Sequence, residues 1–240
     1  MEDRAFDRIG AVSAVAVAGL SLLYAVSYLG ISPADQRSDN ADKFFGSYLA
    51  QPSGFRIASV CLLLSGLASG LAVVALAGRL SVTGGRSMQW VSATGVVVGF
   101  ATAAHGLSQM LEVDKLAHRY ATGDAATRSA VAVAHLAPSA ADPRGLATFC
   151  LAGLVALMLG WAVRPSHLQL GSLGVVLGVD MVALFVANAV GINALVLVTG
   201  GLASVILGPL WWVGVARVLW GPRTAPAPVA DPSPVSVHQS

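Results

Sequence analysis

The sequence predicts an all-α fold, a polytopic bundle of about six helices that cross a membrane. Of its 240 residues, 55% are hydrophobic and only 11% are charged, whereas ordinary soluble domains carry about 25% charged residues. The apolar residues also come in blocks of about 18 to 25, the length that a helix needs to cross the hydrocarbon core of a bilayer. The predicted spans are 9–31, 57–78, 90–111, 146–163, 170–190 and 194–219.

The first span is expected to stay in the protein as an anchor. Glu2, Asp3 and Asp7 make a leader that is poor in basic residues. The apolar run behind them is longer than the core of a cleavable signal, which has about 7 to 15 residues.

The connection between the first two spans predicts a short helix in the membrane interface. The segment 32–35, Ser-Pro-Ala-Asp, is typical of a capped helix start. Phe44, Phe45, Tyr48 and Leu49 then recur at helical spacing. Such spacing places the large side chains on one face, as in helices that lie on a membrane surface.

A second short helix is predicted after the third span. The third helix is expected to continue to about Thr122, where Gly123 stops it. Asp124 can then cap a helix over 125–137, which Pro138 ends. Both short helices would cover the outer end of the bundle.

The last two spans and the tail are marked by small and rigid residues. Only Gly191, Ile192 and Asn193 join the fifth span to the sixth, which predicts a tight antiparallel hairpin. From Gly221 the chain is rich in proline and poor in apolar residues, so 221–240 is predicted to be disordered or extended.

Orientation rests on the short connections, because the Lys and Arg residues divide equally between the two sides. Positive charge is denser on the short connections, which favours both termini in the cytoplasm. An even number of spans also places the five tryptophans on one side, as in an interfacial belt. They are Trp90, Trp161, Trp211, Trp212 and Trp220.

Pairs of glycines four residues apart predict close helix contacts inside the membrane. Helices in lipid associate by close backbone approach, which small residues permit. The pairs are Gly66 and Gly70, Gly95 and Gly99, and Gly174 and Gly178.

The third span carries a polar stripe, which is where the sequence points to function. His105, Ser108, Gln109, Glu112 and Arg119 fall within about a third of the helix circumference. Because an ionisable residue inside a span is costly in lipid, it is expected to face protein or water.

The fifth span adds two polar residues to this candidate site. Asp180 lies near the middle of the span, and Asn188 follows two turns later on the same broad face. A pair of His105 and Asp180 could relay protons, or Asp180 could simply hold two helices together. The candidate polar pocket consists of His105, Gln109, Glu112, Arg119, Asp180 and Asn188.

Several specific chemistries are disfavoured by the sequence. It has no HExxH, Walker or GxSxG motif, and a single histidine within the spans cannot supply two haem ligands. We therefore expect no cofactor, no metal site and no assigned catalytic residue. A net charge of +2 gives no basis for a nucleic-acid partner. The expected partners are membrane lipids, together with a second copy of the chain or a partner membrane subunit.

The arrangement resembles a group of bacterial integral membrane proteins, the domain-of-unknown-function group DUF4386. The resemblance covers most of the chain and rests on six spans, a long connection after the third, and two stretches. These are Leu116-Ala117-His118-Arg119-Tyr120 and Pro209-Leu210-Trp211-Trp212-Val213-Gly214. It implies a multi-pass protein of a bacterial plasma membrane and implies no reaction.

Three hypotheses for function follow. The first is a structural or accessory membrane subunit, in which the polar stripe specifies helix contacts. The second is binding or transport of a small solute or lipid in a polar pocket between the third and fifth spans. The third is a membrane-embedded enzyme that uses His105 with Glu112 or Asp180 as acid and base. The enzyme ranks last, because no nucleophile with an adjacent base is evident.

Overall fold

The computed structural model describes residues 2–29, 40–136 and 141–222. Within these ranges the chain forms helices and no strand. Six helical stretches are long and apolar enough to cross a membrane, so the predicted all-α, multi-pass bundle is confirmed. They are Arg4–Ser27, Pro52–Ser81, Gly85–Thr122, Pro143–Val163, Leu168–Val190 and Asn193–Trp220.

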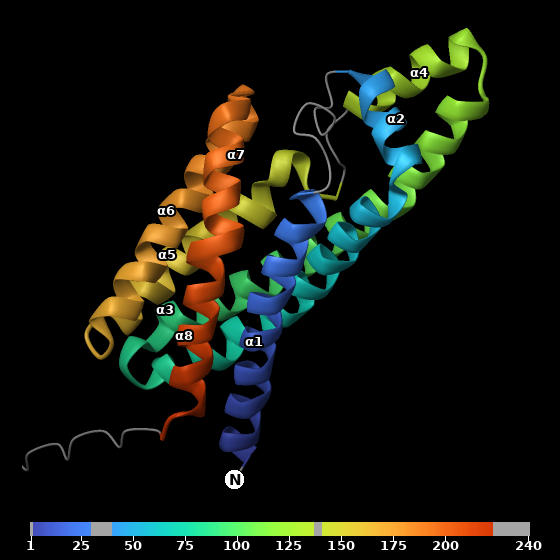
Figure 1. The fold of residues 1–240 in the computed structure, drawn as a ribbon. Helices are drawn as coiled ribbons and strands as arrows, with labels where there is room; N and C mark the ends of the chain where they lie inside the picture. Colours follow the sequence, from blue (N-terminus) through green and yellow to red (C-terminus); the bar gives the residue numbers. More distant parts are fainter. Residues whose placement is uncertain (1, 30–39, 137–140, 223–240) are drawn as a thin grey trace, which may run out of the picture.

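The helices follow one another with short connections, and several predicted boundaries move outward by a few residues (Figure 1). The segment 32–35, Pro138 and the tail from 223 lie outside the described residues. In chain order the elements are α1 (Glu2–Leu29), α2 (Ala41–Ala50), α3 (Pro52–Thr122), α4 (Ala125–Leu136), η1 (Pro143–Gly145), η2 (Leu146–Leu151), α5 (Ala152–Val163), α6 (Leu168–Val190), α7 (Asn193–Gly201), η3 (Leu202–Leu207) and α8 (Gly208–Trp220).

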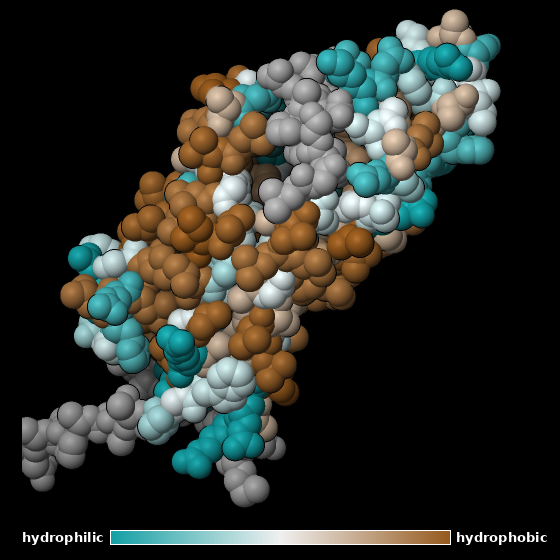
Figure 2. Space-filling model, viewed as in Figure 1, coloured by the Kyte–Doolittle hydropathy of each residue, from teal (hydrophilic) through white to brown (hydrophobic). Residues whose placement is uncertain are grey.

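Large apolar side chains cover the middle of the molecule. Figure 2 shows them as a broad band across the spans, with polar residues gathered toward the ends. Phe100, Val198 and Leu111 are among the most exposed. Because lipid tails are as apolar as these side chains, a helix bundle in a membrane can expose them without cost.

The start of α1 and the end of α8 lie on the same side of the bundle, which we call the terminal face (Figure 1). The opposite side, which carries α2 and α4, is the cap face. This arrangement agrees with an even number of spans. The α6–α7 hairpin turns at Gly191, whose φ of 77° is in the left-handed region that favours glycine.

Helix α3 contains two antiparallel spans rather than one straight rod. The chain reverses at Gly85, where φ is 53° and ψ is −136°, a backbone conformation open in practice only to glycine. The sequence predicted a connection of about eleven residues between 78 and 90. Instead, helical turns continue almost to the reversal, because one glycine suffices to break the helix.

Glycines bring the two halves of α3 into backbone contact. A Cβ atom added to Gly66 would lie 2.5 Å from the backbone N of Ala103 and 2.6 Å from the carbonyl O of Gly99. A Cβ on Gly178 would lie 2.5 Å from the carbonyl O of Gly153 in α5. The predicted close packing of small residues is therefore present in both pairs of helices.

Trp211 lies at the centre of the main core, contrary to its predicted place in an interfacial belt. It is 1% exposed and packs among residues of α1, α3, α5 and α6. Gly174 makes room for its ring, since a Cβ there would lie 2.5 Å from it. Trp90, Trp161 and Trp220 are well exposed near the terminal face and keep the predicted position.

A buried arginine ties three helices together at the terminal face. Arg79 Nη1 lies 3.6 Å from the carboxylate of Asp7 in α1, and the two side chains are only 14% and 5% exposed. The same guanidinium donates hydrogen bonds to the carbonyl oxygens of Leu219, Gly221 and Pro222. These bonds also satisfy carbonyl groups that the end of α8 leaves without helical partners.

The cap consists of α2, α4 and the part of α3 beyond residue 112. The second span of α3 has 38 residues, or about 57 Å at 1.5 Å per residue, well beyond a hydrocarbon core of about 30 Å. Phe44, Phe45 and Tyr48 of α2 pack there against Ala117 and Val131. The predicted short helices thus form, and they pack on each other.

Local caps fix the ends of these helices as the sequence predicted. Gly123 follows the last turn of α3, and its N–H donates to the carbonyl of Arg119. Asp124 caps α4 by accepting a hydrogen bond from the backbone N–H of Thr127. The hydrogen bonds from Thr127 hold the pKa of Asp124 below its usual value.

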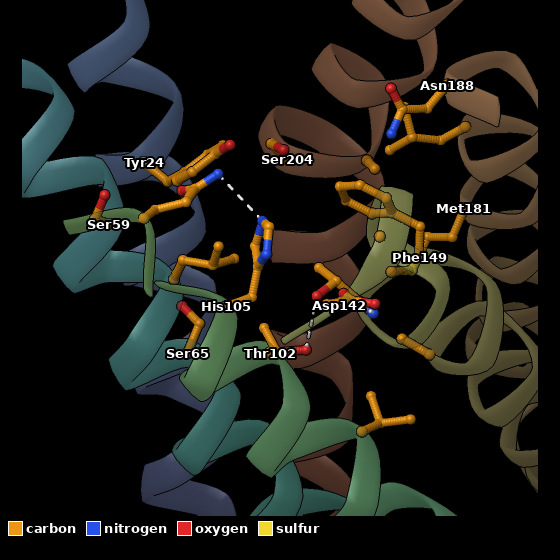
Figure 3. A pocket seen from close by; sticks show the side chains of 18 of the residues that line it. Tyr24, Ser59, Ser65, Thr102, His105, Asp142, Phe149, Met181, Asn188 and Ser204 are labelled. Carbon is orange, nitrogen blue, oxygen red and sulfur yellow. Dashed lines mark hydrogen bonds between the residues drawn. The ribbon is translucent and has the colours of Figure 1, made fainter. Parts of the chain in front are cut away.

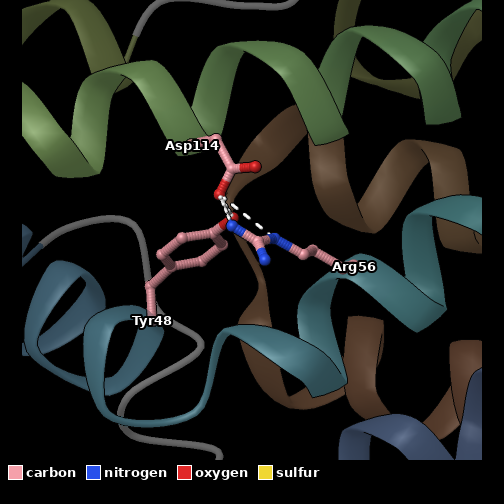
Figure 4. Close-up of polar contacts among 3 residues, drawn as sticks. All are labelled: Tyr48, Arg56 and Asp114. Carbon is pink, nitrogen blue, oxygen red and sulfur yellow. Dashed lines mark hydrogen bonds and ion pairs between the residues drawn. The ribbon is translucent and has the colours of Figure 1, made fainter.

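Three polar side chains join the parts of the cap (Figure 4). Asp114 of α3 accepts hydrogen bonds from Arg56 Nη2 at 2.8 Å and Nε at 3.3 Å. Tyr48 of α2 donates its hydroxyl hydrogen to the same carboxylate oxygen. Burial, strengthened by the bond to Asp114, raises the pKa of Tyr48 to about 12. The phenol therefore stays protonated and keeps donating at physiological pH.

Acidification is expected to loosen α4 from α2. The His135 ring lies 4.1 Å from the Phe44 ring and 5.1 Å from the Phe45 ring, and burial lowers the pKa of His135. A lowered pKa in the folded state means that the unfolded chain binds the proton first, so stability falls as pH drops below about 6.5. Hydrogen exchange over 125–136, corrected for intrinsic rates, should become faster between pH 7 and pH 5.

The variant His135→Phe should keep α4 equally protected at both pH values. His118→Gln is the matched control, because His118 is exposed on α3, and it should behave like the wild type. If His135→Phe loses protection on acidification as much as the wild type, another group drives the change.

Candidate functional site

A cavity of about 910 Å³ lies inside the bundle and below the cap. Its walls come from α1, both spans of α3, η2 with α5, α6, and η3 with α8, and the cap helices α2 and α4 line its outer end. Figure 3 shows polar side chains from these elements pointing toward a common space. The volume is at the upper end of the range for small-molecule sites, about 300 to 1,000 Å³.

Two irregular turns flank this cavity. η2 and η3 are π-helical turns within the fourth and sixth spans. Thr148 and Phe149 of η2 and Ala203 and Ser204 of η3 line the cavity. Such turns insert an extra residue into a helix and are frequently found at functional sites.

The polar stripe of the third span lines the cavity as far as Glu112. His105, Ser108, Gln109 and Glu112 all contribute to the wall. The amide Nε2 of Gln109 lies 3.1 Å from Nε2 of His105. Because an amide nitrogen can only donate, the imidazole Nε2 accepts, and in the neutral ring the hydrogen is on Nδ1.

Nδ1 of His105 is buried and has no hydrogen-bond partner among residues 2–29, 40–136 and 141–222. A buried donor without a partner costs about 1 to 3 kcal/mol. Such groups are tolerated in native proteins mainly where function or water explains them. His105 is therefore the residue of the predicted site with the strongest indication of a role.

Asn188 also lines the cavity and holds a strained turn at the start of the fourth span. Its Nδ2 donates to the carbonyl O of Arg144 at 2.9 Å, and Arg144 Nη1 donates to the carbonyl O of Ala189 at 2.7 Å. Arg144 has a φ of 56°, in the left-handed region that non-glycine residues rarely adopt. Strain of this kind costs about 1 to 3 kcal/mol and is concentrated at functional sites.

Two predicted site residues do not join the others. Arg119 is exposed on the part of α3 that extends into the cap, and it does not line the cavity. Asp180 does not line it either, since α6 turns Leu177, Met181 and Leu184 inward. The expected contact between His105 and Asp180 is not formed. One oxygen of Asp180 is buried and without a hydrogen-bond partner in the described part of the chain.

Asp142, and not Asp180, is the buried carboxylate that lines the cavity together with His105. It lines the cavity and is only 2% exposed, and with Glu112 it is close enough to interact electrostatically with His105. Its carboxylate accepts hydrogen bonds from the backbone N–H groups of Ala147 at 2.7 Å and Thr148 at 2.9 Å. The signal for this cap was present, since an aspartate and a proline precede the apolar run of the fourth span.

The cavity carries its charged residues toward the cap face and is apolar toward the terminal face. Arg56, Glu112, Arg144 and Asn188 line its outer end together with aromatic residues of the cap, among them Phe44, Tyr48 and Phe55. The residues deepest along each span are apolar, and they are Val17, Val73, Val98, Val155, Leu159, Leu177, Trp211 and Trp212. Between the two ends lie hydroxyl groups, among them Thr102 and Thr148, whose oxygens are 3.2 Å apart.

No protein-family model, curated protein or solved structure significantly matches the chain. The evidence for function therefore comes from the cavity. In the described residues, no three His, Cys, Asp or Glu side chains are grouped so that they could hold a metal ion, and Cys61 and Cys150 are both free.

Proposed function

We propose that this multi-pass membrane protein binds, and carries or presents, a small molecule in the cavity between its spans. The observation that supports this most is the place of His105, Gln109 and Glu112 on the cavity wall. Side chains that only specified helix contacts would be enclosed by neighbouring helices. The second of the three hypotheses is therefore favoured over a purely structural role.

The spans form two tightly packed pairs, and this arrangement is suited to binding and releasing a small molecule. Tight backbone contacts join the two spans of α3, and others join α5 to α6. The cavity lies between these pairs, with α1 on one wall and η3 and α8 on another. Two rigid pairs around one site are an arrangement that can open and close by small relative shifts.

The proposal also includes the kind of membrane that holds the protein and the side on which its termini lie. The resemblance to DUF4386 supports a bacterial plasma membrane, and the density of positive charge on the short connections supports cytoplasmic termini. The cap would then lie outside the cell, and the polar end of the cavity would open toward it. Membrane lipids and a second copy of the chain are the proposed partners.

A variant that fills the cavity should abolish binding. Ser65 lines the cavity and is half buried, so Ser65→Phe places a ring in the space. The neighbouring Leu64 is 44% exposed on the lipid side, so Leu64→Phe is the matched control. Native mass spectrometry of protein purified in a mild detergent should show a bound small molecule with the wild type and with Leu64→Phe, and none with Ser65→Phe.

Equal occupancy in Ser65→Phe and Leu64→Phe would contradict the proposal, as would a wild-type protein that carries nothing in the cavity. As a control, a cooperative thermal unfolding transition measured without ligand establishes that each variant is folded. The bound molecule is identified from its mass after dissociation in the gas phase.

A further inference from the structure

We infer that the occupant of the cavity is a single-chain amphiphile, with its chain against Trp211 and Trp212 and its headgroup at the cap face. This inference rests on the proposed function and specifies its ligand class. Three features of the cavity support it: its length, its apolar floor and the unpaired polar groups at its outer end.

The cavity is long and narrow. Along the first span of α3 its lining extends from Arg56 to Val73, which is about 26 Å at 1.5 Å per residue. A compact cavity of 910 Å³ would be only about 12 Å across, near the size of a compact drug-like ligand. Spread over that length, the same volume forms an elongated passage, which suits an extended ligand better than a compact one.

The floor of the cavity offers only apolar contacts. Leu159, Leu177 and Val73 line it there with the two tryptophans. Leu159 and Trp211 are each 1% exposed, so the cavity narrows and closes at this end. Leu159 and Trp211 also belong to the main core. Hydroxyl groups higher on the wall bond within the protein, since Ser21 donates to Val17 and Ser69 to Gly66. The apolar end of a ligand can approach this closed floor, whereas a polar solute would lose its hydrogen bonds there.

The outer end offers hydrogen-bond acceptors that the protein leaves free. Glu112 is exposed and makes no ion pair or hydrogen bond with other described residues. The side-chain amide nitrogens of Gln109 and Asn188 donate hydrogen bonds to His105 and to the carbonyl of Arg144, respectively. Their side-chain carbonyl oxygens remain available as acceptors. Three free acceptors favour a headgroup that carries hydroxyl groups.

Tryptophan fluorescence can locate the hydrocarbon chain of the bound amphiphile. Trp90, Trp161 and Trp220 are exposed, and replacing them with Phe leaves Trp211 and Trp212 as reporters. The probe is a monoacylglycerol with two bromine atoms near its methyl end, added at a low mole fraction to nanodiscs of unbrominated lipid. Bromine quenches the fluorescence of nearby indole rings only. We therefore expect this probe to quench Trp211 and Trp212 strongly, and a second probe with its bromines next to the headgroup to quench them much less.

The cavity variants make this test specific. In the same background, Ser65→Phe should raise the probe concentration for half-maximal quenching by about tenfold, a loss of about 1.4 kcal/mol, and Leu64→Phe should leave it unchanged. A fatty acid with the same brominated chain tests the headgroup. Weaker quenching by the fatty acid supports the hydroxyl-bearing headgroup, and stronger quenching overturns that part of the inference.

Glycerol, which has the headgroup of the probe without its hydrocarbon chain, distinguishes the amphiphile inference from the proposed binding of a small molecule. If glycerol raises the unfolding temperature in a way that Ser65→Phe abolishes, while no brominated chain quenches the reporters, the cavity binds a polar solute. The amphiphile is then wrong and the proposed function stands. Quenching that is equal in Ser65→Phe and Leu64→Phe, or independent of bromine position, also overturns the inference.

Discussion

Replacing Arg79 with alanine is expected to lower the free energy of unfolding by about 3 to 5 kcal/mol, the range for breaking a buried ion pair from one side. The change would remove the cation that lies 3.6 Å from the buried Asp7 carboxylate. It would also remove the hydrogen bonds that join α3 to the carbonyl groups of Leu219 and Gly221. Reversible unfolding by sodium dodecyl sulfate in mixed micelles measures the difference.

Arg86→Ala is the matched control for this change. Arg86 is exposed just beyond the reversal of α3, and its loss should alter stability by less than about 0.5 kcal/mol, as for most surface substitutions. Equal effects of the two variants would show that Arg79 does not hold the terminal face together.

Gly66→Ala is expected to destabilise the protein by about 2 to 3 kcal/mol, as overpacking in a tight contact does. The new methyl group would lie 2.5 Å from the backbone N of Ala103. Backbone atoms cannot swing aside as a side chain can, so the two spans of α3 must separate. The same unfolding measurement reports the loss, and the cavity wall formed by both spans should bind its ligand less tightly.

Gly19→Ala is the control for the glycine series. Nothing lies within 4 Å of a Cβ atom added to Gly19, so the methyl group meets no obstacle. Alanine is the better helix former by about 0.5 to 1 kcal/mol, and this variant should be neutral or slightly more stable. A Gly66→Ala protein as stable as Gly19→Ala would contradict the close packing of α3.

The spans and caps were predictable because they depend on local physical chemistry. Hydrophobic length determines which segments can cross a bilayer. Asp124 and Gly123 act on the backbone within a few residues of themselves, so the ends of the cap helices could be read from short patterns. The break at Gly85 was harder to locate, since many glycines lie near span ends and the sequence does not mark which of them reverses the chain.

The structure places four of the six residues of the predicted pocket on the cavity wall, and the position of Asp180 has a physical explanation. His105, Gln109, Glu112 and Asn188 line the cavity, whereas Asp180 does not. Which face of α6 points inward depends on how the helix is rotated, and that rotation is set by contacts with distant segments, such as that between Gly178 and Gly153. Span lengths carry no information on it.

The predicted place of Trp211 in an interfacial belt came from its position along the sixth span, which does not determine the direction that its side chain faces. One extra residue in η3 shifts every following position by about 100° relative to a uniform helix. Trp211 comes after η3 and faces the core. A sequence pattern based on one helical period cannot anticipate such an insertion.

The central claim is that the space between the two pairs of spans holds a chain-like molecule. An experimental density map of protein purified without removal of bound lipid tests it most directly. We predict continuous elongated density from Trp211 and Trp212 to the groups around Glu112. Helices packed together with no space between His105 and Met181 would contradict it.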